Sequence, residues 1–460
     1  MVKANFQHLP QELFDTIAKD LSISSIYSLR LLSRDISTKA TKCEIFHSCF
    51  QNFRLELSRR RLTSLALLTQ DVGLAQRVRN LTIVGRAYRT ARPGGLHGDH
   101  STLTGLEKQQ ADDTLVQRQG LDSSLLTTIF SNLVLSNSRD LDTISMVIVV
   151  YMDDSNPPVV PRDAVGISPS IISQACLDTF SSVVLALQET SLSFRALDLF
   201  KSGPAGFECG VPSIALSPST WKASLTTHTF STLRSLAISV AEMPLPPHSS
   251  EARRFDVLGT DIIKNSVDLT RLIALLRACS NLEEAYITPY RQHDSSNTPI
   301  KEQSVRLSHR AEQMECLLSV KIPRLRKLHL AGFVLSPKDL RTFLKNHAST
   351  LRSIELSHLV FEGIGHLLRL LPLLVGESFH LEHIRLHNLY QDNLFAFTNE
   401  ADPDFSETFD NGRGIIIHAG ADGTVQFAPY IYTPRIRRGN LADHEYRLRL
   451  KQEFGVVLRE

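Results

Sequence analysis

The sequence predicts an α/β protein, with a small helical unit at its N-terminus followed by a curved solenoid of strand-and-helix repeats that irregular insertions interrupt. Apolar residues recur at helical spacing in the first fifty residues, and an apolar-x-x-apolar-x-apolar pattern recurs through the rest. Segments with helical periodicity separate copies of that pattern. We expect three domains, at residues 1–55, 56–395 and 396–460, of which the last holds a hairpin and a capping helix.

Length, charge and cysteine content narrow the class of protein. The 460 residues exceed the usual length of a single domain. The 50 Lys and Arg residues against 48 Asp and Glu residues leave a net charge of +2, which gives no chain-wide field for nucleic acid or a membrane surface. Six scattered cysteines without a Cys-x-x-Cys pair favour a reducing compartment over a disulfide framework or a zinc finger.

Targeting and membrane segments are not expected. The first fifteen residues contain charges and no apolar run, which argues against a secretory signal. The longest apolar run, Ile144 to Met152, is too short to cross a bilayer and is typical of a buried strand. We therefore expect a soluble protein of the cytoplasm or nucleus, with no cofactor, no nucleic-acid partner and no membrane partner.

The helical unit begins at Pro10, which suits the first turn of a helix because its missing N–H has no intrahelical partner there. Three apolar groups follow at helical spacing. They are Leu13, Phe14, Ile17 and Leu21, then Ile26, Leu29, Leu32 and Ile36, then Ile45, Phe46, Cys49, Phe50 and Phe53. Three short helices make a thin core, so an apolar face left exposed would favour a protein partner.

The repeat pattern is clearest in three copies, at 325–330, 351–356 and 381–386, with steps of 26 and 30 residues. Weaker copies begin at Val78, Leu141, Phe194, Leu233 and Leu282. A pattern this loose is expected to include chance matches. We expect helices between copies at 171–189, 266–279 and 304–319, at Ser336-Pro337, where a cap precedes proline, and at Ile364, Leu367, Leu368 and Leu371. Stacking covers the apolar face of each repeat.

Segments rich in Gly, Pro, Ser and charge interrupt the repeats and are expected to be surface loops. They are 88–113, 153–169, 201–220, 241–255 and 289–303. After an acidic segment at 398–413, Ile415–His418 and Val425–Phe427 suggest a hairpin, and 435–460 suggests a basic amphipathic helix.

The opening segment resembles an F-box over about residues 6–50. The shared features are Leu9-Pro10-x-Glu12-Leu13-x-x-x-Ile17-x-x-x-Leu21 and Ile26-x-x-Leu29-Arg30-Leu31-Leu32-Ser33-Arg34. The later copies resemble the degenerate leucine-rich repeats of fungal F-box proteins. They differ from the regular repeat because Phe333, Leu359 and Leu389 stand where a buried Asn usually lies.

The resemblance implies a substrate receptor of an SCF (cullin-RING) ubiquitin ligase, without a catalytic site of its own. The F-box would dock on the Skp linker protein, and through it on a cullin, while the repeats hold an unknown protein substrate. The residues carried over for linker binding are Leu9, Pro10, Leu13, Ile17, Leu21, Ile26, Leu29 and Leu32. The alternative is a non-catalytic repeat scaffold outside ubiquitin transfer, whose helical head is a cap. A remoter alternative is an enzyme whose site is assembled from the insertions.

A substrate surface is expected on one face of the strands, because side chains alternate along a strand. The candidates are Lys327, His329, Ser353, Glu355, His383, Arg385 and His387, with Asp198, Glu284 and Tyr286 from earlier copies. This mixed-charge face could hold an acidic or phosphorylated segment, and the alternative is a solvated face without a ligand. His380, His383 and His387 superficially resemble a metal cluster, since His383 and His387 would share a face of a helix, but their strand pattern argues against a metal. The phosphate-loop, dinucleotide and hydrolase motifs are absent.

Overall fold

The computed structural model describes a large part of the chain. The described residues are 9–21, 23–43, 50–89, 105–136, 140–152, 157–164, 166–201, 209–216, 229–241, 269–290, 314–357, 359–361, 370, 374, 380–387, 389–391, 393–394 and 414–418. They form an α/β protein whose strands pair mostly in parallel. The chain divides into two compact units. The first comprises Met1–Ala164 and Asp178–Leu197, and the second comprises Val165–Leu177 and Asp198–Glu460. This division does not test the expected boundaries at residues 55 and 395, which stay predictions.

The first unit opens with three short helices, which we call the head. They are α1 (Gln11–Lys19), α2 (Ile23–Arg30) and α3 (Arg34–Lys42). The expectation of one helix from Ile26 to Ile36 was wrong, because the Ser33 hydroxyl accepts a hydrogen bond from the Ile36 N–H (3.2 Å) and starts a new helix. Leu32 therefore lies in a turn.

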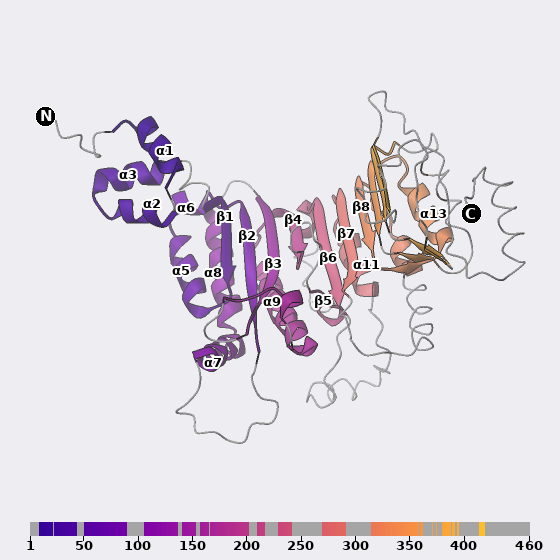
Figure 1. Cartoon of the computed structure of the whole chain (residues 1–460), viewed down its shortest axis with the longest axis horizontal. Helices are drawn as coiled ribbons and strands as arrows, with labels where there is room; N and C mark the ends of the chain where they lie inside the picture. The colour runs from indigo at the N-terminus through magenta and orange to yellow at the C-terminus, as the bar shows by residue number, and fades with distance from the viewer. Residues whose placement is uncertain are drawn as a thin grey trace, which may run out of the picture. The chain divides into compact units, whose positions relative to one another are not determined.

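An α/β layer follows the head in the first unit. Its elements are β1 (Asn52–Glu56), α5 (Arg59–Leu68), α6 (Val72–Ala75), β2 (Asn80–Tyr88), α7 (Gly105–Arg118), α8 (Leu121–Ser136), β3 (Leu141–Tyr151), the 3-10 turn η3 (Pro161–Asp163), α9 (Pro169–Glu189) and β4 (Phe194–Leu199). Strands β1, β2 and β3 run parallel and side by side (Figure 1). The last helix and strand have residues in both units.

The second unit contains a parallel row of strands closed by one antiparallel strand. In spatial order they are β6 (Ser235–Ala241), β7 (Glu284–Tyr290), β8 (Lys327–Ala331), β10 (Ser353–Ser357), β12 (His383–His387) and antiparallel β15 (Gly414–His418). The short β5 (Val211–Pro212) pairs with β6, and two 3-10 turns, η5 (Ser213–Leu216) and η8 (Phe230–Thr232), precede β6. Helices α11 (Leu269–Ala278) and α13 (Pro337–Asn346) lie between strands in sequence (Figure 1).

All eight copies of the repeat pattern coincide with strands, so none was a chance match. Equivalent apolar positions also pair across neighbouring strands. Leu81 is level with Ile144, and Ala285, Leu328, Ile354 and Ile384 form one continuous row. A ninth copy, Phe50-x-x-Phe53-x-Leu55, was assigned to a helix from sequence but leads into β1, where Phe53 pairs with Leu81. The third helical group expected from sequence was therefore wrong at Phe53, whereas Phe50 is helical, and Ile45, Phe46 and Cys49 lie outside the described residues.

A second, smaller sheet follows the last three copies. It contains β9 (Val334–Leu335), β11 (Val360–Phe361), β13 (Tyr390–Gln391) and β14 (Asn393–Leu394). Phe333, Leu359 and Leu389 are all buried just before these strands. Backbone bonds connect the turns here, because Gly332 N–H donates to Ser357 O (3.0 Å) and Val360 N–H to Phe333 O (2.9 Å). Buried apolar side chains and these backbone hydrogen bonds therefore hold the turns together at the positions where a regular repeat has a buried asparagine.

Several expected loops contain regular structure. Tyr88 is the last residue of β2 and 105–113 belongs to α7, so the loop expected at 88–113 was wrong at both ends. Helix α8 was not predicted from the sequence. The turn η3, β5 with η5, and the end of β7 lie in the loops expected at 153–169, 201–220 and 289–303. The loop expected at 241–255 lies outside the described residues beyond Ala241.

The other helices and the hairpin have mixed outcomes. The structure confirms helices at α9, α11 and α13, where the Ser336 hydroxyl accepts from the Lys338 N–H (3.2 Å). The segment 304–319 is described only from Met314, where it is helical. Strand β15 pairs with β12, while Val425–Phe427 and the helix expected at 435–460 lie outside the described residues. So does the helix at Ile364–Leu371, apart from the buried Leu370.

Helix α9 passes a length-and-composition test for a membrane span. Its window Ser170–Glu189 covers 20 residues with a mean hydropathy of 1.5, and 61% of the window is buried within the structure. Buried core helices of soluble proteins pass the same test. The sequence expectation of no such segment considered only uninterrupted apolar runs.

A buried histidine joins α13 to the segment before β8. His347 Nε2 accepts a hydrogen bond from the Ile322 N–H (3.0 Å), and its Nδ1 lies 2.8 Å from Phe343 O. Because Nε2 accepts, Nδ1 must carry the proton and donate to that carbonyl. Burial lowers the pKa of His347 below its usual 6.5, and the charge of Lys321 acts in the same direction. The neutral ring is therefore the form that fits.

We expect His347→Ala to lower the free energy of unfolding by about 2 kcal/mol, because it leaves the Ile322 N–H buried without its acceptor. The lowered pKa also means that the unfolded chain binds the proton more readily. Stability supplied by the neutral ring is present above about pH 6.5 and declines as the pH falls through the folded-state pKa. Urea unfolding between pH 5 and 8 measures both effects. The exposed His380→Ala is the control, and an unchanged pH slope in His347→Ala would contradict the assignment.

Candidate interaction surfaces

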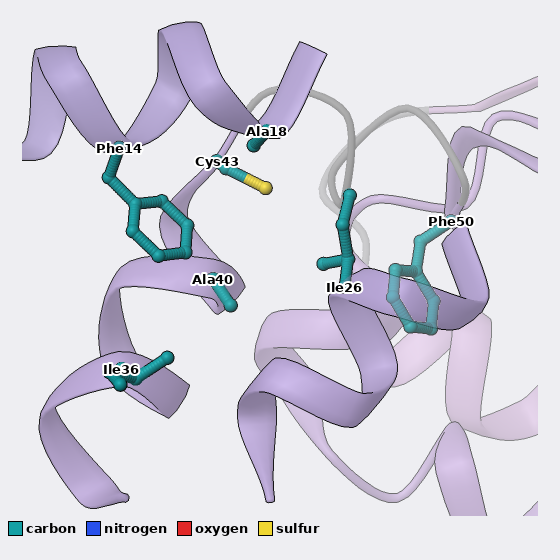
Figure 2. Close-up of a cluster of buried hydrophobic side chains, with 7 residues drawn as sticks. All are labelled: Phe14, Ala18, Ile26, Ile36, Ala40, Cys43 and Phe50. Carbon is teal, nitrogen blue, oxygen red and sulfur yellow. The ribbon is translucent and has the colours of Figure 1, made fainter. Parts of the chain in front are cut away.

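The head has an apolar core to which the neighbouring α/β layer also contributes. Its seven residues are Phe14, Ala18, Ile26, Ile36, Ala40, Cys43 and Phe50, and Figure 2 shows Phe14 pointing from α1 toward α3. Leu68 and Leu74, from the ends of α5 and α6, also pack against this core. The head therefore shares its core with the first α/β layer, which fixes it to that layer within the first unit.

The start of α1 is tied to α3 by polar bonds. Lys39 Nζ donates to the Leu9 carbonyl (2.5 Å), and Gln11 Nε2 donates to the Lys39 carbonyl (3.1 Å). These bonds satisfy the Leu9 carbonyl just before α1 and a carbonyl in the last turn of α3, and they hold the Leu9-Pro10 segment against α3. Pro10 is exposed, and these bonds fix its position.

An apolar surface remains on the outside of the head. Leu13 and Ile17 are exposed and lie one helical turn apart on the same face of α1. Leu31 and Leu32 are exposed in the turn between α2 and α3, and Leu31 is 88% exposed. We call Pro10, Leu13, Ile17, Leu31 and Leu32 the head surface. Apolar side chains that gather on one exposed face, as Leu13 and Ile17 do on α1, favour a protein-binding surface.

The eight residues carried over for linker binding divide into exposed, buried and half-buried groups. Pro10, Leu13, Ile17 and Leu32 are exposed, whereas Ile26 is fully buried in the head core. Leu9, Leu21 and Leu29 are half-buried, and the last two pack against that core. Leu31 belongs to the motif that resembles an F-box but was not predicted to bind the linker. It falls outside the helical spacing of Ile26, Leu29 and Leu32, and this could have indicated that its side chain is exposed.

The strand face of the second unit brings most of the expected substrate residues together. Across β7, β8, β10 and β12 the pairing forms two rows, which we call the charged face. One row is Glu284, Lys327, Ser353 and His383, and the other is Tyr286, His329, Glu355 and Arg385. Parallel pairing in register therefore explains why residues from distant copies lie side by side.

Glu355 is the centre of the second row. Its Oε2 lies 3.0 Å from His329 Nδ1, and its Oε1 lies 3.1 Å from Arg385 Nη1. Burial by itself raises the pKa of this carboxyl. The contact with His329 and the charges of His329, Arg385 and His383 outweigh burial, so the pKa of Glu355 is lowered. Glu355 is therefore ionised at neutral pH.

The first row contains a second ion pair, with Lys327 Nζ 2.6 Å from Glu284 Oε1. The hydrogen bond to Glu284 raises the pKa of Lys327 and keeps it charged. Lys327 and Arg385 thus each have a carboxylate partner. An anionic ligand must share these two cations with Glu284 and Glu355.

A lysine outside the expected set contributes to the same face. Lys201 Nζ lies 4.2 Å from the centre of the Tyr286 ring, and Tyr286 stacks on His329 with centroids 5.7 Å apart. The preceding residue, Phe200, has a left-handed φ of 63°, which is costly for a bulky side chain. Lys201 was placed in an expected loop, so only the structure brings it next to Tyr286.

The histidines do not form a metal site among the described residues. His383 is half-buried on the charged face and His380 is exposed beyond its edge, while the side chain of His387 lies outside the described residues. In the described part of the chain, three His, Cys, Asp or Glu side chains are nowhere grouped for a metal ion. His383 belongs to a strand, as the apolar pattern predicted.

A cluster of buried polar side chains lies near the ends of β2 and β3 in the first unit. Asp113 of α7 accepts hydrogen bonds from Arg86 and from the Tyr88 hydroxyl. The Tyr88 ring stacks on Tyr151 at 5.4 Å, and the Tyr151 hydroxyl donates to Glu56 (3.3 Å). Burial raises the pKa of Asp113 to about 6, although the Arg86 charge opposes this shift. Sequence reasoning missed this cluster because it treated Asp113 as a loop residue.

The sequence does not match any protein-family model, and no curated protein matches it. The class of the protein therefore follows from the chain itself. It is an α/β protein with repeated strands in a mostly parallel sheet and a three-helix head that presents exposed leucines.

Proposed function

We propose that this chain is an F-box-type substrate adaptor of an SCF ubiquitin ligase, in which the head docks on the Skp linker and leucine-rich-repeat-like units hold a protein substrate. The observation that carries the proposal is the head surface, where apolar side chains stay exposed around a head whose core is already filled. These side chains occupy the motif positions that resemble an F-box. The adaptor would contribute binding and orientation, while the linker and cullin recruit the chemistry.

The architecture supports a division of labour between head and repeats. Equivalent apolar residues pair across successive strands, as a stacked solenoid requires. The head shares its core with the first α/β layer, so a docked linker would have a fixed position relative to that layer. Residues 1–50 alone would lack Leu68 and Leu74, and for this reason the full chain is the appropriate reagent.

We expect Leu13→Asp/Ile17→Asp to abolish binding to the Skp linker while leaving the fold intact. Each apolar side chain buried at an interface contributes about 1.5–3 kcal/mol, so losing both is expected to weaken binding by at least about a hundredfold. Both residues are exposed, so neither substitution disturbs the head core. Titration calorimetry of the full chain with purified linker measures the effect.

Leu135→Asp is the control, because Leu135 is an exposed leucine on α8 outside the head. It is expected to bind the linker like the wild type. Equal binding by the head variant and the wild type would refute the assigned docking surface. A wild-type chain that does not bind the linker would favour the alternative of a repeat scaffold with a helical cap.

A further inference from the structure

We infer that the charged face of the second unit binds an acidic peptide segment, through the outward-facing cations Lys327 and Arg385. This inference rests on the proposed function for its role in substrate choice, but the binding itself can be tested without the ligase. It specifies the chemistry of the substrate as clustered aspartate or glutamate side chains.

The order of exposure within each ion pair supports this assignment. The side chains of Lys327 and Arg385 are 51% and 42% exposed, against 30% for Glu284 and 25% for Glu355. The carboxylates therefore lie deeper and the cations lie outermost. Lys327 has three N–H donors and Arg385 has five, so each retains donors beyond those directed at its carboxylate. A ligand approaching this face meets positive charge and unused donors first.

The spacing suits an extended segment. Lys327 and Arg385 lie on strands separated by β10 and two residues apart in register, so they are about 10 Å apart across the sheet and about 7 Å along it, or about 12 Å in all. In a polyproline-type peptide, carboxylates three residues apart lie on one side of the chain at about 9 Å. Flexible lysine and arginine side chains bridge the remaining difference. One extended acidic segment can therefore reach both cations together.

The first unit provides a contrast on its own strands. There the side chains of Arg86 and Tyr88 already donate hydrogen bonds to Asp113 of the chain's own helix α7. The Arg86 side chain is only 4% exposed. Lys327 and Arg385 are also paired with carboxylates but stay about half exposed, whereas the buried Arg86 is out of reach of an external ligand, so the binding residues are assigned to the second unit.

The test is fluorescence anisotropy of the full chain with a labelled peptide of about twelve residues that has glutamate at every third position. The peptide with glutamine in place of glutamate is the uncharged comparison. We expect the glutamate peptide to bind with salt-sensitive affinity and the glutamine peptide not to bind. Lys327→Ala/Arg385→Ala should weaken binding at least tenfold, while Arg341→Ala, which removes an exposed arginine from α13, should leave it unchanged.

A variant with the opposite expected effect makes the test sharper. Glu355→Gln keeps the size of the side chain but removes the charge that competes with the ligand for Arg385. It should tighten binding of the glutamate peptide several-fold. A purely structural network would instead show unchanged or weaker binding in this variant.

Four results would overturn the inference, of which three concern the peptide directly. They are no binding of the glutamate peptide, equal binding by Lys327→Ala/Arg385→Ala, and binding only when phosphoserine replaces glutamate. Binding that appears only after the acidic residues of the chain's own segment 398–413 are changed to amides would also overturn it, because the occupant would then be internal. Linker binding is measured in parallel, so retained linker binding without peptide binding refutes this inference and leaves the adaptor proposal standing.

Discussion

Asp113→Ala is expected to lower the free energy of unfolding by about 3–5 kcal/mol, because it leaves the buried Arg86 guanidinium without its carboxylate. The Arg86 side chain is 4% exposed and that of Asp113 is 10% exposed, so water cannot replace the lost partner. The Tyr88 hydroxyl loses its acceptor at the same time. Urea unfolding at pH 7.5 measures the loss. Asp112→Ala, which changes the exposed neighbour on α7, is expected to stay within about 0.5 kcal/mol of the wild type.

The double variant Arg86→Met/Asp113→Leu separates pairing from burial. Because burial raises the pKa of Asp113 to about 6 in spite of the Arg86 charge, desolvation outweighs attraction at this pair. Replacing both charges with apolar side chains is therefore expected to recover most of the stability lost in Asp113→Ala. A double variant as unstable as the single one would show that the ion pair itself stabilises the fold.

Gly85→Ala is expected to lower the free energy of unfolding by about 3 kcal/mol through overpacking. A Cβ atom on Gly85 of β2 would overlap the hydroxyl of Thr179 on α9 and lie 2.6 Å from Cδ1 of Ile148 on β3. The helix approaches the sheet here as closely as the absence of a side chain allows. Urea unfolding of the variant tests this directly.

Gly85→Ala/Thr179→Ala is expected to recover part of that loss, because it removes the overlapping hydroxyl while the Thr179 Cβ position stays close. Gly73→Ala is the control, since its added Cβ would meet only the Asp71 carboxylate at 3.3 Å, at an exposed position on α6. Equal stability of Gly85→Ala and the wild type would mean that α9 lies farther from β2 than described.

The strands were predictable because their signal is local. Each copy of the pattern places apolar residues at fixed steps, and all eight copies identified from sequence coincide with strands. The expected residues of the charged face were found for the same reason, since alternation along a strand assigns them to one face. The ninth copy at Phe50 was missed because helical and strand spacings overlap in so short an apolar group.

Contacts between distant segments could not be predicted. Asp113 is 27 residues from Arg86, and its burial depends on how α7 docks rather than on its neighbours in sequence. Lys201, which meets Tyr286, follows Phe200, whose left-handed backbone conformation its side chain does not favour and no sequence pattern indicates. At the head, the motif predicted the exposed Leu13 and Ile17, but the Ser33 cap that starts α3 was overlooked.

The most direct test of the account is size-exclusion chromatography of the full chain with the Skp linker, for the wild type and for Leu13→Asp/Ile17→Asp. The account predicts that the wild type co-elutes with the linker as one complex, and that the head variant elutes separately at the position of the folded chain alone. Separate elution of the wild type and the linker would contradict the adaptor function.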